Sequence, residues 1–270
     1  MIRHLLQLIW NQRKQNAWLW AELLLVSVFL WFLVDYLYVM GRTYTAPLGF
    51  DIRHTYSIVI SSLSERSPDY IPKEKRERPD GVHLLTALDR IRTYPGVESA
   101  CLTDGGMPYY MGSRNLVWRI DTLQVPCRYA FVTPEFLDVF RIYDKDGKTA
   151  SLKRAIEDNN SIVISADVET MNPGLSLLGQ KAYRGNVTDE IEETIRGISV
   201  PIRRHEYTKA EPNVYRALRL SRMEEGYYEG MIDAVRLCVR VRPDVDNADF
   251  PARFRKDMAE QLRLGNLYLL

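Results

Sequence analysis

The sequence predicts an α+β fold, in which one N-terminal transmembrane helix precedes a folded domain on the far side of the membrane. A single long apolar run lies near the N-terminus, at residues 17–40. A strand, a helix and a second strand follow within residues 55–102, which is the order of a βαβ-like or ferredoxin-like unit. Short strands and helices then continue to residue 264, and we expect the domain to form two lobes.

Residues 17–40 have the length and the flanking residues of a membrane-spanning helix. At 1.5 Å per residue this segment reaches about 36 Å, and the hydrocarbon core of a bilayer is about 30 Å thick. Trp18 and Trp20 precede its uncharged part, and Tyr36 and Tyr38 follow it. Aromatic side chains at both ends are typical of the two membrane interfaces. The carboxylates of Glu22 and Asp35 lie within about a turn of these aromatic positions, where they can reach water among the lipid headgroups.

The first sixteen residues indicate the orientation of this helix. They carry three basic side chains and no acidic one: Arg3, Arg13 and Lys14. Basic flanks stay in the cytoplasm, so the N-terminus is expected there and residues 41–270 outside. Apolar residues at helical spacing predict a short amphipathic helix on the inner membrane surface: Ile2, Leu5, Leu6 and Ile9. A cleavable signal peptide is the competing interpretation, which the long polar lead and Pro47 disfavour.

The first part of the exported domain reads as strand, loop, helix and strand. Residues 55–63 favour a strand, and residues 64–80, with three prolines and charges of both signs, favour a loop. Asp80 is expected to cap a helix that ends before Pro95-Gly96. Its apolar face is predicted from the residues at helical spacing: Val82, Leu85, Leu88 and Ile91. Residues 97–102 form the second strand.

Further elements follow from apolar periodicity and turn residues. Strands are predicted at 116–120, 125–132, 161–165, 195–202 and 214–220, and short helices at 135–140 and 151–158. Thr133 is expected to cap the first of these helices, with Pro134 in its first turn.

The last strand and the last helix are expected to share a core. In residues 235–241 apolar side chains alternate with Arg236, Cys238 and Arg240, which predicts one buried face and one face in water. The helix predicted at 250–264 carries apolar residues at i, i+4 spacing, and Gly265 ends it. Phe254 should face the strand and Arg255 should face water.

No catalytic, cofactor-binding or metal-binding residues are predicted, and we expect the chain not to be an enzyme. The four histidines are scattered, and His205-Glu206 lacks the second histidine of an H-E-x-x-H site. The run Asp144-Lys145-Asp146-Gly147 resembles a calcium loop, but its glycine comes at the fourth position and Ala155 stands at the twelfth. It is predicted to be a hairpin turn. The sequence contains no G-x-x-x-x-G-K run and no G-x-S-x-G run.

Charge and cysteine content exclude further classes of site. With 36 basic and 35 acidic side chains, the chain offers no excess of positive charge for nucleic acid. Cys101, Cys127 and Cys238 form no C-x-x-C pair, and each lies in a strand-like run where a free cysteine acts as a small buried apolar residue. A Cys101–Cys127 disulfide stays open as the alternative in an oxidising compartment.

Four segments, in order along the chain, carry a resemblance to a known family. They are LLTALDRIRTYPGVESACL (84–102), YAFVTPEFLDVFRI (129–142), NSIVISADV with LLGQKAY (160–168 and 177–183), and AVRLCVRVRPDVD (234–246). Together with the basic lead and the single span, they resemble the permeases of MacB/FtsX-type ABC transporters. The likeness is closest to the stand-alone, Bacteroidetes-like type with its MacB-like periplasmic core domain.

The resemblance implies an architecture and partners. The periplasmic domain would comprise a ferredoxin-like lobe, from residues 50–148 with 232–268, and an inserted lobe at 149–231. The membrane would be the bacterial inner membrane, with a cytoplasmic N-terminus. A separate cytoplasmic ABC ATPase would hydrolyse ATP, a second permease copy would complete the transporter, and a periplasmic partner or substrate would be moved or signalled to.

The family has three further transmembrane helices after the core domain, and this sequence ends at Leu270 without them. We expect a truncated permease, because the apolar ending GNLYLL does not resemble a polar tail. The alternative is a single-span, membrane-anchored sensing or binding module that works without an ATPase.

Overall fold

The computed structural model describes residues 3, 4, 7, 10, 17–110, 112, 114–185, 190–228 and 232–269. Most of the amphipathic lead predicted for residues 1–16 lies outside these residues. The chain divides into two units, Met1–Pro47 with Glu206–Thr208, and Leu48–His205 with Lys209–Leu270. Each unit is described on its own.

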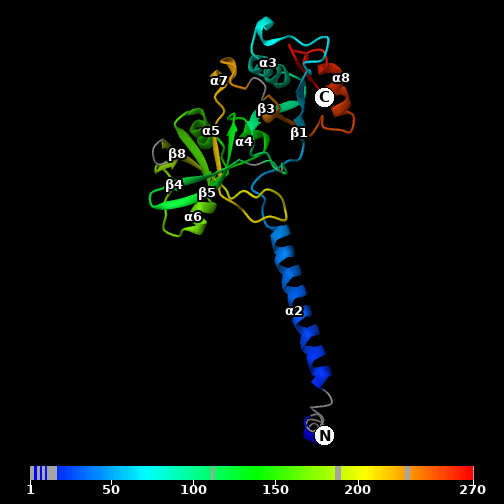
Figure 1. Cartoon of the computed structure of the whole chain (residues 1–270), viewed down its shortest axis with the longest axis vertical. Coiled ribbons are helices and arrows are strands. Elements are labelled where there is room, and N and C mark those ends of the chain that lie inside the picture. The colour runs from blue at the N-terminus through cyan, green and yellow to red at the C-terminus, as the bar shows by residue number, and fades with distance from the viewer. Residues whose placement is uncertain are drawn as a thin grey trace. The chain divides into compact units, whose positions relative to one another are not determined.

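The first unit is built on the helix α2, which runs over Ala17–Thr45 and contains the predicted span (Figure 1). None of its residues is buried, and its mean hydropathy over the most apolar window is 2.2. Among the described residues it is the one helix long and apolar enough to cross a membrane. The ring of Tyr44 packs against that of Tyr207, with centroids 5.6 Å apart.

The second unit begins with a ferredoxin-like half. Its strands are β1 (Thr55–Ile58), β2 (Ile60–Ser62), β3 (Val97–Asp104), β10 (Arg236–Val241) and β11 (Leu267–Leu269). Its helices are α3 (Asp80–Arg92) and α8 (Phe250–Met258). Strand β10 pairs antiparallel with β1 on one side and β3 on the other, and β11 pairs with β2. Because β10 lies between the two strands that α3 connects, this is a split βαβ arrangement. The predicted α+β class and ferredoxin-like unit are confirmed.

Six further strands close into a barrel. They are β4 (Arg114–Ile120), β5 (Leu123–Val132), β6 (Ser161–Ser165), β7 (Lys181–Arg184), β8 (Ile191–Ser199) and β9 (Asn213–Ala217). Their order is β5-β4-β7-β8-β6-β9, and β9 pairs back onto β5 in parallel. Strands β4 and β5 come from the range 50–148, which the sequence analysis placed with the ferredoxin-like lobe, and the other four come from the range expected as an insert.

The apolar residues of this unit form three clusters. The first lies between the ferredoxin-like sheet and helices α3 and α8, and includes Leu88, Val239 and Phe254. The second covers the opposite face of the same sheet and includes Cys101, Cys238 and residues of α4 (Phe136–Val139) and α5 (Ala150–Glu157). The third receives side chains from all six barrel strands, with Trp118 fully buried, so it fills the barrel interior.

Four short segments connect these parts. They are η1 (Lys73–Lys75), α6 (Asp167–Met171), α7 (Leu220–Glu224) and η2 (Ile232–Ala234). Strands β7 and β11 and helices α6 and α7 were not predicted from the sequence.

Strand β10 corrects one prediction and α8 confirms another. Cys238 and Arg240, expected on a wet face, are buried, because α4 packs on that side of β3 and β10. Phe254 is buried in the cluster that includes Val239, and Arg255 is exposed, as predicted. Helix α8 ends at Met258 rather than near residue 264.

Two predicted helix caps are wrong. Pro79, not Asp80, precedes the first turn of α3, and the Asp80 carboxylate instead accepts a hydrogen bond from Arg76 Nη1 at 3.0 Å. On the predicted apolar face of α3, Leu88 and Ile91 are buried as expected, whereas Val82 and Leu85 are only partly buried, and Leu84 and Ala87 complete the buried face. Thr133 does not cap α4, since its hydroxyl accepts a bond from the backbone N–H of Leu102 in β3 at 3.2 Å.

Candidate functional site

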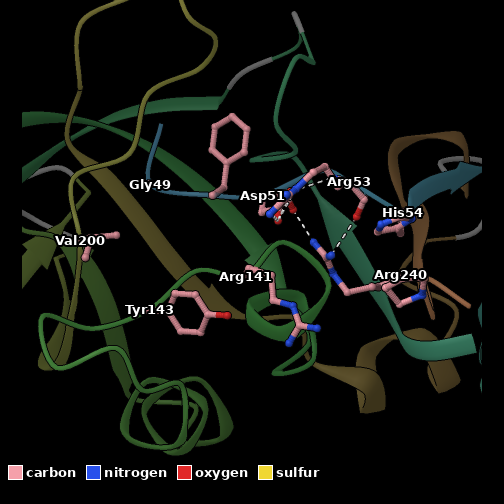
Figure 2. A pocket seen from close by; sticks show the side chains of 10 residues that line it. Gly49, Asp51, Arg53, His54, Arg141, Tyr143, Val200 and Arg240 are labelled. Carbon is pink, nitrogen blue, oxygen red and sulfur yellow. Dashed lines mark hydrogen bonds and ion pairs between the residues drawn. The ribbon is translucent and has the colours of Figure 1, made fainter. Parts of the chain in front are cut away.

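A solvent-open pocket of about 650 Å³ lies in the second unit, next to the first residues of that unit (Figure 2). Five of its lining residues come from the post-anchor segment, residues 48–55, which directly follows the first unit: Gly49, Phe50, Asp51, Arg53 and His54. Others come from the end of α4 and from β10. Because the pocket brings together segments far apart in the sequence, we take it and the network behind it as the candidate site.

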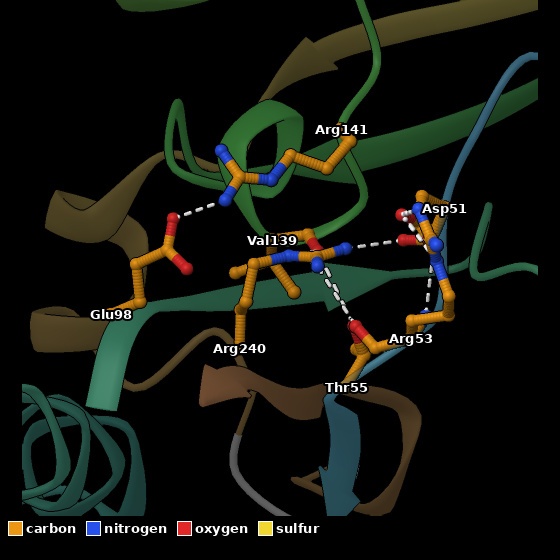
Figure 3. A network of polar contacts seen from close by, with 7 residues as sticks. All are labelled: Asp51, Arg53, Thr55, Glu98, Val139, Arg141 and Arg240. Atoms are coloured by element: carbon orange, nitrogen blue, oxygen red, sulfur yellow. Dashed lines mark hydrogen bonds and ion pairs between the residues drawn. The ribbon is translucent and has the colours of Figure 1, made fainter. Parts of the chain in front are cut away.

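The side chain of Arg240 is the centre of this network (Figure 3). It projects from β10 and is 3% exposed. Its Nε donates to the carbonyl oxygen of Val139 at 2.7 Å, and Nη1 donates to that of Arg53 at 2.8 Å. Its Nη2 donates to the carbonyl oxygen of Asp51. One guanidinium therefore joins β10, the end of α4 and the post-anchor segment.

The charge of the buried Arg240 guanidinium must be compensated, and this requirement makes its binding to three carbonyl oxygens specific for arginine. Burial lowers the pKa of Arg240, and the positive charge of Arg141 lowers it further. A guanidinium still keeps its proton in a protein, so the buried charge must be compensated by hydrogen bonds. Three carbonyl oxygens supply that compensation with their dipoles. The planar fork of arginine fits three acceptors at once, which a lysine ammonium does not match.

Other contacts hold the post-anchor segment in the domain. The Leu48 carbonyl accepts from the N–H of Arg203 at 3.0 Å, and the Asp51 N–H donates to the Phe140 carbonyl at 2.9 Å. Gly49 has a φ of +82°, and a Cβ atom there would lie 2.1 Å from the Pro201 oxygen. The segment is thus fixed by several elements of the second unit rather than forming a free linker.

The surrounding charges are paired with one another. The carboxylate of Asp51 receives two hydrogen bonds from the Arg53 side chain, which hold the pKa of Asp51 below its usual value. Arg141 bonds Glu98 of β3. His54 Nδ1 lies 2.5 Å from the Asp246 carboxylate, which also accepts from the Tyr56 hydroxyl. These two bonds lower the pKa of Asp246.

Two of the pocket residues have a backbone conformation that favours glycine. His54 has a φ of +59° and Arg141 a φ of +51°. Arg141 follows the end of α4, where the Ile142 N–H donates to the Leu137 carbonyl at 2.9 Å, as in a Schellman motif. A residue with a side chain loses roughly 1 kcal/mol of stability in this left-handed backbone conformation. The Arg141 side chain forms an ion pair with Glu98, and the His54 ring forms a hydrogen bond with Asp246. Backbone strain of this kind gathers at functional positions.

Helix α4 connects this network to the barrel. The Thr55 hydroxyl lies 3.4 Å from the Val139 carbonyl, which Arg240 also contacts. At the other end of the helix, the ring of Phe136 packs against that of Tyr215 in β9, with centroids 5.5 Å apart. Helix α4 is therefore in contact with both the post-anchor segment and a barrel strand.

The site contains few groups suited to chemistry. The described residues hold no cluster of three or more His, Cys, Asp and Glu side chains that could bind a metal ion. The run starting at Asp144 forms the predicted turn, closed by the Gly147 N–H on the Asp144 carbonyl at 3.1 Å. The sequence analysis missed Arg240, and the alternation of β10 even suggested that it faced water. An arginine within a strong strand was the one signal that could have drawn attention to it.

Comparison with known proteins gives likenesses of fold at low sequence identity. No protein-family model and no curated protein matches the sequence. A domain of a protein assigned as a permease from Porphyromonas gingivalis is 18% identical, over 68% of this chain and 73% of that chain, with a TM-score of 0.47. The extracellular domain of the ABC-type transporter YknZ from Gram-positive bacteria is 12% identical, over 80% and 99%, with a TM-score of 0.48. The periplasmic region of MacB from Actinobacillus actinomycetemcomitans is 8% identical, over 85% and 93%, with a TM-score of 0.47.

Proposed function

We propose that the chain is a permease subunit of a MacB/FtsX-type ABC transporter, non-catalytic itself and coupled mechanically to a separate ATPase. In this proposal α2 anchors the protein in the bacterial inner membrane, with its N-terminus in the cytoplasm. The second unit is periplasmic and works in export, lipoprotein release or envelope signalling. A second permease copy would complete the transporter.

One observation carries this proposal: three of the four segments on which the family resemblance rests meet in the Arg240 network. Glu98 belongs to segment 84–102, Val139 and Arg141 belong to segment 129–142, and Arg240 belongs to segment 234–246. Segments that lie far apart in the sequence are here joined by direct contacts (Figure 3). The resemblance therefore describes one structural centre.

The geometry of that centre suits the transmission of movement. The post-anchor segment is continuous with α2 in sequence, and a force on the anchor reaches it first. Arg240 passes that force to β10 and to α4, which packs on the barrel. Close-packed elements such as β10 and α4 shift as units and do not deform gradually. No reaction is needed at the site for this role.

Recovery of partners from native membranes tests the proposal. A tagged full-length chain, cross-linked before solubilisation, should co-purify with an ABC ATPase and should confer ATP hydrolysis on the purified complex. Recovery without any nucleotide-hydrolysing subunit would contradict the proposal and favour the single-span sensing module.

Cysteine labelling in intact spheroplasts tests the orientation separately. A cysteine at Ser67→Cys should react with a membrane-impermeant maleimide, and one at Gln12→Cys should not. The native cysteines are buried and give a low background. The opposite pattern of labelling would place the second unit in the cytoplasm.

A further inference from the structure

Two of the three cysteines face each other across neighbouring strands. Cys101 of β3 and Cys238 of β10 are direct partners in the antiparallel register. Both are 0% exposed, and both belong to the second apolar cluster, so their side chains lie on one face of the sheet. Cys127 lies in the barrel cluster instead. The structure therefore does not favour the Cys101–Cys127 pairing that the sequence left open.

The strand register places the Cα atoms of the two cysteines at a separation that a disulfide can span. Leu102 exchanges hydrogen bonds with Thr133, so its N–H and C=O point away from β10. The backbone groups of its neighbour Cys101 then point toward β10, which makes Cys101 and Cys238 a hydrogen-bonded pair. Such pairs have Cα atoms about 5.5 Å apart, inside the range of about 4.4–6.8 Å found for disulfides.

We propose that Cys101 and Cys238 form a disulfide when the domain folds in an oxidising compartment, and that Cys127 stays a free thiol. The oxidant is a small-molecule or protein disulfide. One cysteine thiolate attacks it and releases one thiol, and the second cysteine then attacks the mixed disulfide and releases the other thiol. Two cysteine thiols lose two electrons and two protons in total, and the oxidant gains them. The proposed function enters only through the compartment.

Burial determines when this bond forms. In the folded reduced domain, burial raises the pKa of the Cys101 thiol, which leaves almost no thiolate to attack an oxidant. Closure therefore happens before α4 covers β3 and β10. The closed bond is then shielded from reductants by the same cover. It would fix the two central strands of the ferredoxin-like half, directly beside Arg240.

Thiol counting on the full-length chain tests the proposal without a membrane or an ATPase, so its outcome is separate from that of the transporter proposal. The chain is synthesised cell-free into detergent micelles, with either excess glutathione disulfide or excess dithiothreitol. Folding of the reduced sample is verified by its thiols resisting alkylation until denaturant is added. After denaturation without reductant, we expect one alkylated cysteine, Cys127, in the oxidised sample and three in the reduced sample.

Variants identify the pair. Cys127→Ser should leave no reactive thiol after oxidation and should keep the linked peptide that joins residues 101 and 238. Cys238→Ser should give two reactive thiols and no linked peptide. The oxidised wild type should melt several degrees above the reduced form, because the cross-link restricts a long loop of the unfolded chain. Three reactive thiols after oxidation, a stable glutathione adduct at residue 101 or 238, or a linked peptide containing Cys127 would overturn the proposal.

Discussion

Replacing Arg240 with methionine tests the network that joins the post-anchor segment to the rest of the second unit. The substitution removes three hydrogen bonds from a charged donor, each worth about 1.5–3 kcal/mol. Two effects reduce the net loss. The buried guanidinium no longer has to be desolvated, and the Asp51 and Arg53 carbonyls, beside an open pocket, can accept bonds from water.

The Val139 carbonyl is the group most affected. Its bond to Arg240 is buried, and among the described residues the other side-chain donor in contact with it is the Thr55 hydroxyl, at 3.4 Å. A buried acceptor left with so weak a partner costs about 1–3 kcal/mol. We therefore expect Arg240→Met to lower the free energy of unfolding by about 2–4 kcal/mol. For a unit of this size that corresponds to a melting temperature lower by roughly 5–15 °C.

Thermal and denaturant melts of the full-length chain in detergent measure this loss, and Arg242→Met is the matched control. Arg242 is exposed two residues further along, so its substitution should change stability by less than about 0.5 kcal/mol. Hydrogen exchange should become faster at residues 48–55 and stay unchanged in the barrel strands. Equal melting temperatures for Arg240→Met and the wild type would refute the reasoning, as would equal losses for the two variants.

Three further predictions concern other parts of the second unit. Phe254→Ala should lower the free energy of unfolding by about 3–5 kcal/mol in denaturant melts, because the ring is buried against α3 and β10, whereas Arg255→Ala should change it by less than about 0.5 kcal/mol. Thr133→Ala should cost about 1–2 kcal/mol and Thr133→Ser much less, because the hydroxyl binds a buried N–H of β3. The folded state lowers the pKa of Asp246 below its usual 3.8, so its contribution to stability is complete above about pH 4 and is lost as the pH falls through the lowered pKa. Melts of the wild type and Asp246→Asn should therefore differ at pH 6 and converge toward pH 2, and a constant difference would contradict this assignment.

Much of the fold could be read from local sequence signals. The span at residues 17–40, helix α3 and strands β3, β5 and β6 were predicted within a few residues, because each has a strong periodic pattern and clear turn residues at its ends. Helix caps were predicted less well. Thr133 has the residue type and position of a cap, yet its hydroxyl is closer to a strand that lies more than thirty residues earlier in the chain.

The candidate site could not be predicted in the same way. The bonds of Arg240 join residues that are 101 to 189 positions apart, and no local pattern encodes such contacts. The alternation of apolar side chains with Arg236, Cys238 and Arg240 correctly predicted that residues 235–241 contain a strand. It could not show that α4 covers the second face, so that Arg240, expected in water, is buried.

By itself, the sequence determined which segments are apolar enough to cross a membrane, which form strands and helices, and that the order 55–102 builds a βαβ-like unit. These properties depend on residues within one or two turns of each other, where periodicity and turn preference act directly. Only the tertiary structure decided that six strands close into a barrel, that Cys101 faces Cys238, and that Arg240 holds the post-anchor segment. Strand pairing and burial are set by the global packing of distant segments, so the same residue pattern is compatible with several partners until the chain has folded.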